Sequence, residues 1–416
     1  MVNRLLKRRR FKPGEEWLYY APDSRYVFGA PEIAAVTKAL RKGWLGAGTI
    51  TVEFERAIAP LFGKKYGLFV NSGSSANLLS LLASGLATGG EVITPACTFN
   101  TTVAPIIQSG LVPVLVDVKV GEYVIDTGYL EAARSRRTVA VMVPHLIGNF
   151  ANLNRLRAFC DRHRLLLIED SCDTIGGLYS GRPSGTYSDI TTTSFYGSHI
   201  ITACGAGGMV MSDDAELIKR ARVFSSWGRG LRDYPEPILE RLAAHKVDGK
   251  PYDSAFVFME LGYNFRPTEI QAAFGLAQLK RLPLFTKRRR WAFDSLVSVF
   301  EAYEEYFVLP IEQPECRTQW LAFPLTVRAE APFTRNELVV HLEHHRIQTR
   351  PLFAGNVTKH AAYRDRRYRV VGDLPHSQNI LHNSFLIGAH NTMTADMIRY
   401  IRKVVTSFVS ERTRAA

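Results

Sequence analysis

The chain has 416 residues, of which 46% are hydrophobic and 22% charged, a balance typical of soluble globular proteins with more than one domain. Its formal net charge of +13 favours anionic partners, either nucleic acid or small anionic substrates. No apolar run is long enough to cross a bilayer, and the basic N-terminal stretch is not followed by the apolar segment of a secretory signal. We therefore expect a cytoplasmic protein without membrane association.

Two amphipathic helices come first, because apolar residues recur at spacings of three and four over 31–44 and 52–63. Short apolar runs then alternate with helical segments such as 74–87 and 153–164. Runs that are apolar on both faces are typical of a buried, mainly parallel sheet, and the alternation predicts an α/β fold with helices on both faces. The expected strands are 66–70, 91–95, 112–118, 139–146, 165–170, 190–195 and 208–212.

The pattern changes after about Pro283. A long helical stretch reaches about Tyr306, and then a strand is expected over 320–327, a helix over 335–348 and a closing helix over 395–412. We predict a basic N-terminal arm (1–27), a large α/β domain (28–285) and a small C-terminal α+β domain (286–416).

Two KRRR runs, at 7–10 and 287–290, raise the alternative of nucleic-acid binding. No zinc-finger spacing or RNA-binding signature accompanies them. The second run lies in a helical stretch, where a solvated basic face is the commoner explanation. We expect no nucleic-acid partner. The five cysteines show no paired spacing, which predicts free thiols in a reducing compartment.

Three segments place reactive residue types where strands give way to helices. VNSGSSANLLSLL presents Ser74 and Ser75 at the start of a helix, as a phosphate cradle or as an ordinary helix cap. LLLIEDSCDTIGG puts Asp170 at the carboxyl end of a buried strand, the end that faces the ligand crevice in α/β sheets. A carboxyl group there can hold a pyridinium nitrogen or cap a helix. Phe99, just after another strand, is a candidate to stack on a planar cofactor or a core residue.

A fourth segment, TTTSFYGSHIITACGAGGMVMS, reads as strand, loop and strand. Ser194 ends the first strand and His199 lies on a polar turn. Imidazole titrates near neutral pH, so His199 is a candidate general acid or base, or else a structural histidine.

These segments, with LGYNFRPTEIQAAFGLAQL, resemble the DegT/DnrJ/EryC1/StrS nucleotide-sugar aminotransferases in order and spacing over about residues 28–410. The resemblance implies the fold-type I (aspartate aminotransferase-like) architecture, pyridoxal phosphate (PLP) or pyridoxamine phosphate (PMP) as cofactor, and a homodimer. It also implies the following roles: Asp170 pairs with the pyridine nitrogen, Phe99 stacks on the ring, Asp173 helps to bind the cofactor, Ser74, Ser75 and Ser194 bind the phosphate, and Asn264 reaches the phosphate in the neighbouring subunit.

One position departs from the family pattern. Where the aminotransferases carry the lysine that bonds covalently to PLP, this chain has His199, and no lysine lies between Lys119 and Lys219. The cofactor is then held without a covalent anchor. A histidine at this position favours loss of a hydroxyl group from the substrate over amination, unless the position belongs to a chain that has lost its activity.

The Lys-to-His exchange is typical of the sugar 3-dehydratases of the family, and the segments 348–356 and 367–388 are similar to theirs. Arg350 is expected to meet the nucleotide-sugar. One kind of 3-dehydratase uses a [2Fe–2S] cluster held by four cysteines and needs a reductase. Here Cys172 stands at the first ligand position, but no cysteine follows in 230–264, so the ligand count excludes the cluster and we expect no metal.

The sequence therefore predicts cluster-free, PLP/PMP-dependent removal of the C3 hydroxyl from an NDP-4-keto-6-deoxyhexose. L-glutamate is the expected amino donor, and a deoxysugar pathway such as lipopolysaccharide synthesis is the expected setting. An NDP-4-keto-sugar aminotransferase and a reductase-coupled 3-dehydrase stay open as alternatives, and the nucleotide is undecided.

Overall fold

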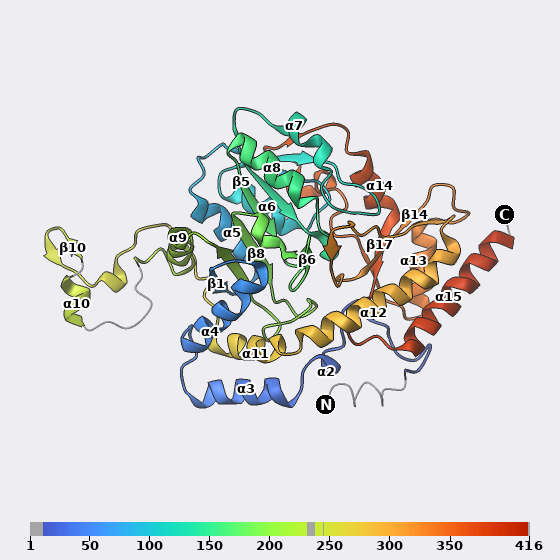
Figure 1. Cartoon of the computed structure of the whole chain (residues 1–416), viewed down its shortest axis with the longest axis horizontal. Helices are drawn as coiled ribbons and strands as arrows, with labels where there is room; N and C mark the ends of the chain where they lie inside the picture. The colour runs from blue at the N-terminus through green and yellow to red at the C-terminus, as the bar shows by residue number, and fades with distance from the viewer. Residues whose placement is uncertain (1–10, 231–237, 244, 415–416) are drawn as a thin grey trace.

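A computed structural model describes residues 11–230, 238–243 and 245–414 (Figure 1). Its centre is an eight-stranded sheet with the order β1-β9-β8-β5-β4-β2-β3-β16. The strands from β8 to β16 run parallel to their neighbours, and β9 is antiparallel to both β8 and β1. The predicted mainly parallel sheet is confirmed. Its strands are β1 (Tyr66–Val70), β2 (Glu91–Pro95), β3 (Val112–Val116), β4 (Thr138–Pro144), β5 (Leu166–Asp170), β8 (Ile190–Ser194), β9 (Gly208–Ser212) and β16 (Arg369–Val370).

Both faces of this sheet are buried, which explains why its strands read as continuous apolar runs. Along β4, Val141 packs into one core with Leu156 of α8, while the next residue, Met142, packs into another core with Leu79 of α5 and Ile218 of α9. The helices of this domain are α2 (Ser24–Val27), α3 (Ala30–Arg41), α4 (Thr49–Ile58), α5 (Gly73–Ser84), α6 (Asn100–Gln108), α7 (Leu130–Ala133), α8 (Leu153–His163), α9 (Ala215–Ser225), α10 (Ile238–Ala243) and α11 (Glu269–Leu279).

A second, antiparallel sheet with the order β12-β14-β17-β15 forms the smaller unit, together with the long helices α12 and α15 (Figure 1). The C-terminal half of the chain also returns to the large unit, because β16 pairs with β3 and β13 pairs with β6. The domain boundary at 285/286 stays a prediction. The elements of this half are α12 (Leu282–Phe300), α13 (Arg335–His344), α14 (Pro375–Asn383), α15 (Ala395–Arg414), β12 (Phe307–Val308), β13 (Cys316–Arg317), β14 (Phe323–Val327), β15 (Thr349–Pro351) and β17 (Ser384–Ile387).

Short strands complete the description: β6 (Leu178–Tyr179) and β7 (Arg182–Pro183) pair with each other, as do β10 (Lys246–Val247) and β11 (Lys250–Pro251). Helix α10 and strand β10 extend away from the two sheets (Figure 1). None of the helices in the described ranges is both long and apolar enough for a membrane span.

The described part of the N-terminal arm lies against the small unit. The Leu18 amide donates to the Arg346 carbonyl at 2.8 Å, and the Gln348 amide donates to the Leu18 carbonyl at 2.8 Å. This pairing brings Tyr20 to the region between the two sheets. Residues 1–10, with the first KRRR run, lie outside the described residues.

The second KRRR run lies in α12 and is not the solvated basic face that its composition suggested. Arg289 is fully buried, and Arg290 pairs with Glu312 at 2.5 Å. Of the four residues in this run, only Lys287 is exposed. The reason is that one face of α12 is interior: Leu282 and Phe285 pack into a core of the large unit, and Phe293 and Leu296 pack into the core of the small unit.

Candidate active site

The carboxyl ends of β4, β5 and β8 meet at one cavity of about 490 Å³. The start of α5 and the residue before α6 also reach it, as does Leu321 from the small unit. Convergence of parallel strand ends is the usual origin of a ligand site in α/β sheets. The sequence-predicted residues that line this cavity are Ser74, Phe99, Asp170, Asp173, Ser194 and His199.

Asp170 ends β5 and is only 7% exposed. Its Oδ2 accepts hydrogen bonds from Asn77 Nδ2 at 2.7 Å and from Thr102 Oγ1 at 2.8 Å. Two neutral donors on two different helices therefore fix the carboxyl group at the floor of the cavity. A buried acidic group held in this way suits a protonated ring nitrogen, since charged groups in an interior need a partner.

The first turn of α5 and the end of β8 approach each other closely. A Cβ atom at Gly73 would lie 2.7 Å from Ser194 Cβ and 3.0 Å from Cys172 Sγ, so the approach requires glycine. Ser74 Oγ donates to Thr101 Oγ1 at 2.9 Å beside the same cavity. Serine hydroxyls at a helix N-terminus form a site that suits a phosphate group.

Phe99 is the N-cap of α6 and its side chain is 53% exposed. Its ring meets Phe353 of the C-terminal half edge to face, with centroids 5.9 Å apart. The ring is therefore not a core residue, and its exposed face beside the cavity is available for stacking.

His199 lies in the loop after β8, where its amide donates to the Tyr196 carbonyl at 3.0 Å. Its side chain is 16% exposed, and Nε2 lies 4.0 Å from Asp173 Oδ1. Desolvation lowers the pKa of His199 to about 4, against the opposing effect of the Cys172 backbone. The imidazole is therefore neutral near pH 7, which is the form that can accept a proton.

Asp173 is shifted in the opposite direction. Burial, with the neighbouring Asp170 charge, raises its pKa to about 7, although the Ile147 amide and Arg289 oppose the shift. The Ile147 amide donates to Asp173 Oδ2 at 3.0 Å. His199 and Asp173 are thus adjacent groups whose pKa values are in reversed order, with the carboxyl group above the imidazole. Strongly shifted pKa values of neighbouring groups are typical of acid–base sites.

Two predicted phosphate-binding residues do not line this cavity. Ser75 is not among the residues that line the cavity, since its hydroxyl lies 3.0 Å from Ser72 Oγ and its amide donates to the same atom. Asn264 is exposed and pairs with Ser226 through the backbone, away from this cavity. The predicted roles of both residues stay predictions.

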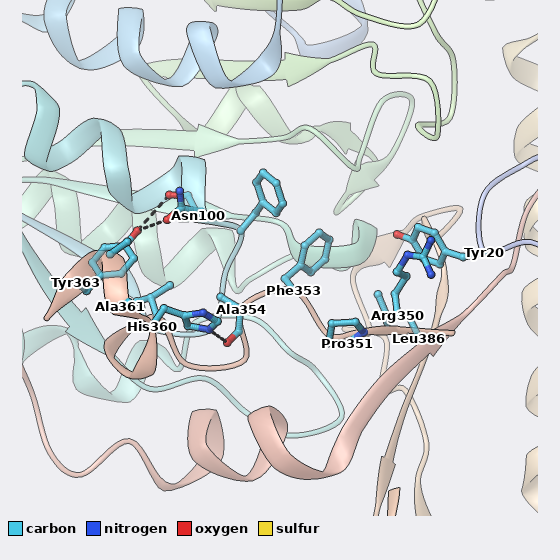
Figure 2. Close-up of a pocket in the computed structure, with 13 residues that line it drawn as sticks. Tyr20, Asn100, Arg350, Pro351, Phe353, Ala354, His360, Ala361, Tyr363 and Leu386 are labelled. Atoms are coloured by element: carbon cyan, nitrogen blue, oxygen red, sulfur yellow. Dashed lines mark hydrogen bonds between the residues drawn. The ribbon is translucent and has the colours of Figure 1, made fainter. Parts of the chain in front are cut away.

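Arg350 lines a second cavity of about 600 Å³ next to the first (Figure 2). The two cavities share Tyr20, Phe99 and Phe353. The second cavity has mainly apolar walls, and its polar groups are few. Among them, Tyr363 donates to Asn100 Oδ1 at 2.7 Å (Figure 2).

Sequence reasoning missed several residues that build the site. Asn77 is a polar residue inside the apolar helix segment ANLLSLL, which is a signal that could have been used. Thr102 stands one helical turn after Phe99. Tyr20 and Phe353 line both cavities, and Arg289 is bonded to the His199 carbonyl. None of the three carries a local signal, because long-range packing brings them to the site.

The fold and the cavity define an enzyme site built for a phosphorylated, aromatic cofactor at the carboxyl edge of an α/β sheet. The family model described as the DegT/DnrJ/EryC1/StrS aminotransferase family matches residues 28–406, so the chain belongs to this family.

Similar proteins include the lipopolysaccharide biosynthesis protein RfbH of Salmonella typhimurium, 38% identical over 91% of this chain and 90% of that protein. The dTDP-4-dehydro-2,6-dideoxy-D-glucose 3-dehydratase of Saccharopolyspora spinosa is 36% identical over 92% of this chain and 86% of its own length. Among solved structures, the E. coli GDP-4-keto-6-deoxy-D-mannose-3-dehydratase with bound hydrated PLP has a TM-score of 0.84 and 28% identity, covering 94% of this chain and 99% of that chain.

These comparisons confirm the predicted family and the aminotransferase-like fold. They also confirm the predicted cofactor class, since a solved relative of the same fold holds PLP. In the part of the chain that the structure describes, no group of three or more His, Cys, Asp or Glu side chains is arranged to hold a metal ion.

The raised pKa of Asp173 predicts a pH-dependent stability difference. Between about pH 4 and pH 7, the folded state keeps a proton on Asp173 that the unfolded state has lost. The contribution of this group to stability is therefore fully present below pH 4 and is lost as the pH rises through 7. Asp173→Asn removes the titration and keeps an acceptor for the Ile147 amide. We expect the variant to gain up to about 4 kcal/mol relative to the natural protein between pH 4 and pH 8.

Urea unfolding of both cofactor-free proteins across this pH range measures the difference. The lowered pKa of His199 makes its contribution to the free energy of unfolding rise with pH in both proteins, so this contribution cancels to first order when they are compared. A stability difference that stays constant with pH would contradict the shift assigned to Asp173.

Proposed function

We propose that the protein is a PLP/PMP-dependent dehydratase that removes the C3 hydroxyl of an NDP-4-keto-6-deoxyhexose without an iron–sulfur cluster. The observation that carries this proposal is His199. It lines the cavity together with Asp170 and with the serines Ser74 and Ser194, at the position where the resemblance places the family's lysine. Among the described residues, no lysine lines either cavity.

When bound as PMP, the cofactor supplies an amine that condenses with the C4 ketone and an electron sink for the loss of the C3 hydroxyl. In the proposal, Asp170 holds the ring nitrogen, Ser74 and Ser194 hold the phosphate, and Phe99 covers the ring. Neutral His199 takes the proton from the cofactor's C4′ carbon and returns one to the departing hydroxyl, which leaves as water. Asp173, 4.0 Å from the imidazole, stabilises the protonated form of His199 after this transfer.

The overall reaction needs two electrons, because a CHOH group becomes CH2. L-glutamate supplies them in the proposal: it is oxidised to 2-oxoglutarate, and its nitrogen is released as ammonia when the substrate's C–N bond is hydrolysed. No external reductase is then required. A cytoplasmic location, where L-glutamate is available, is part of this proposal.

The two adjoining cavities suggest how a nucleotide-sugar lies. The hexose has to reach His199 in the smaller cavity, so the rest of the substrate extends past Phe353 into the cavity in Figure 2. Arg350 contributes a guanidinium group to the lining of that second cavity, and a guanidinium is suited to bind a diphosphate. The apolar walls beyond it suit a nucleoside.

We also infer that the protein is a homodimer in which Asn264 completes the partner's phosphate site. Asn264 is exposed, and the neighbouring Leu261 is 95% exposed, which leaves an uncovered apolar surface there.

Sedimentation of Asn264→Ala with Leu261→Asp is expected to show a monomer with weakened PLP binding. A natural protein that sediments as a monomer and binds PLP normally would contradict this inference.

Turnover with PLP, L-glutamate and a panel of CDP-, GDP- and dTDP-4-keto-6-deoxyhexoses, followed by mass spectrometry, tests the activity. We expect a product that lacks one oxygen, with ammonia and 2-oxoglutarate formed in equal amounts and no reductase added. His199→Gln should lower kcat by about 10²–10⁴-fold, because a positioned acid–base group is lost. His163→Gln, on α8 outside both cavities, is the matched control and should behave like the natural protein.

An amino sugar as product would make the chain an aminotransferase, and so would a pyridoxyl-lysine peptide after borohydride reduction. A product that forms only when a reductase is present would favour the reductase-coupled dehydrase.

Arg350→Met tests the placement of the substrate. We expect KM for the nucleotide-sugar to rise by about 10–100-fold, the usual cost of losing a charge-assisted hydrogen bond, while kcat stays within about threefold. Arg346→Met is the control, since Arg346 lies outside both cavities and donates to the Glu15 carbonyl at 2.6 Å. An unchanged KM in Arg350→Met would show that the diphosphate lies elsewhere.

A further inference from the structure

Arg289, the third residue of the second KRRR run, is a fully buried cation. Its described partners are carbonyl oxygens rather than carboxylates. Nη1 donates to Leu321 O at 3.0 Å, and to Trp320 O and Ala389 O at 3.4 Å each. These carbonyls belong to two separate segments of the C-terminal half, which the one guanidinium joins.

The other arm of the same guanidinium points to the active site. Nη2 donates to the carbonyl oxygen of His199 itself at 3.4 Å. Arg289 therefore links the backbone of the His199 turn to the small unit. The guanidinium makes these bonds from two different nitrogen atoms in one fixed plane, whereas the ammonium group of a lysine would have to make them all from a single nitrogen.

The charge of Arg289 also acts on the site. Burial lowers the pKa of Arg289 to about 10, so the group is still charged near neutral pH, and Tyr20 and Asp173 favour the charged form. In return, its charge is one of the influences that hold down the pKa values of His199 and Asp173. The other ionisable groups that line the cavity of His199 are His145, Asp170, Cys172 and Tyr196.

The flanking residues of the run do not share this arrangement. Arg288 donates to the Asn391 carbonyl at 2.5 Å, and Arg290 is bonded to Glu312 and Asp294. Lys287 is exposed. Arg288 thus already ties α12 to the rest of the small unit, and within the run the contact with His199 is made by Arg289.

We propose that Arg289 is a positioning residue for His199: its guanidinium fixes the backbone of the His199 turn against the small unit and places a buried positive charge beside that turn. The inference rests on the proposed role of His199 in catalysis. The geometry of the contact itself does not depend on which substrate is used.

Two variants separate the two parts of this role. Arg289→Gln removes the charge and keeps amide donors, and Arg289→Lys keeps the charge and removes the fork. Lys287→Gln is the matched control, because it removes one charge from the exposed face of the same helix. Two readouts on the full chain without substrate are needed: the NMR titration of 13C-labelled His199, assigned with His199→Gln, and hydrogen–deuterium exchange of the peptide 196–206.

In Arg289→Gln we expect His199 to titrate at higher pH than in the natural protein, because loss of a nearby cation favours the imidazolium form. We expect the 196–206 amides to exchange about tenfold faster in both Arg289 variants, since the tie of the loop is lost. In Arg289→Lys the titration of His199 should stay close to that of the natural protein. Turnover should fall by about 10–100-fold in both variants, with KM nearly unchanged.

A His199 titration and a loop exchange in Arg289→Gln that match Lys287→Gln would overturn the proposal. If Arg289→Gln does not fold, the exchange of Arg289→Lys decides in the same way. Neither readout uses turnover, so a failure of the proposed dehydratase activity would appear separately, in the product assay.

Discussion

Burial of the Asp170 carboxyl group is the constraint on which the rest of the site depends. A carboxylate at the end of a central strand, covered on both faces of the sheet, costs several kcal/mol unless it is hydrogen-bonded. Asn77 on α5 and Thr102 on α6 meet that need at 2.7 and 2.8 Å. Satisfying one carboxyl group therefore fixes the starts of two helices, which in turn set the serine cradle at Ser74 and the ring of Phe99.

Around this fixed group, one histidine lies between a carboxyl group and a guanidinium group. Asp173 is 4.0 Å from its ring, and Arg289 is bonded to its backbone. Desolvation favours the neutral imidazole, and Arg289 acts in the same direction, whereas Asp170 acts against it. In the proposed elimination, this balance would let His199 return within one reaction cycle the proton that it takes up, because a proton on a desolvated imidazole is held weakly.

Much of the large domain could be predicted from the sequence, because its strands are buried on both faces and stand out as apolar runs. The predicted bounds of β1, β2 and β9 agree with the structure, while β3 ends two residues early, at Val116, before the buried Asp117. Asp117 instead accepts from the amides of His376 and Ser377, far away in the chain.

The site could be predicted in part. Residues at strand ends and helix starts, such as Asp170 and Ser194, follow from local pattern. Tyr20 and Arg289 do not, because the first lies in a segment read as a basic arm and the second in a run of positive charge read as solvated. Their positions depend on contacts across a hundred residues or more, with Gln348 and Ala389 respectively, which no local spacing encodes.

The return of the chain to the large sheet through β16 has a consequence for how ligands enter. Strand β16 is hydrogen-bonded beside β3, and β13 is bonded to β6, so the C-terminal half is attached to the large domain at two places besides α12. A hinge that opened the two units as rigid bodies would have to break these strand pairings. Ligand entry is therefore expected to depend on rotation of exposed side chains at the mouth, such as Phe99, while the framework around them keeps its shape.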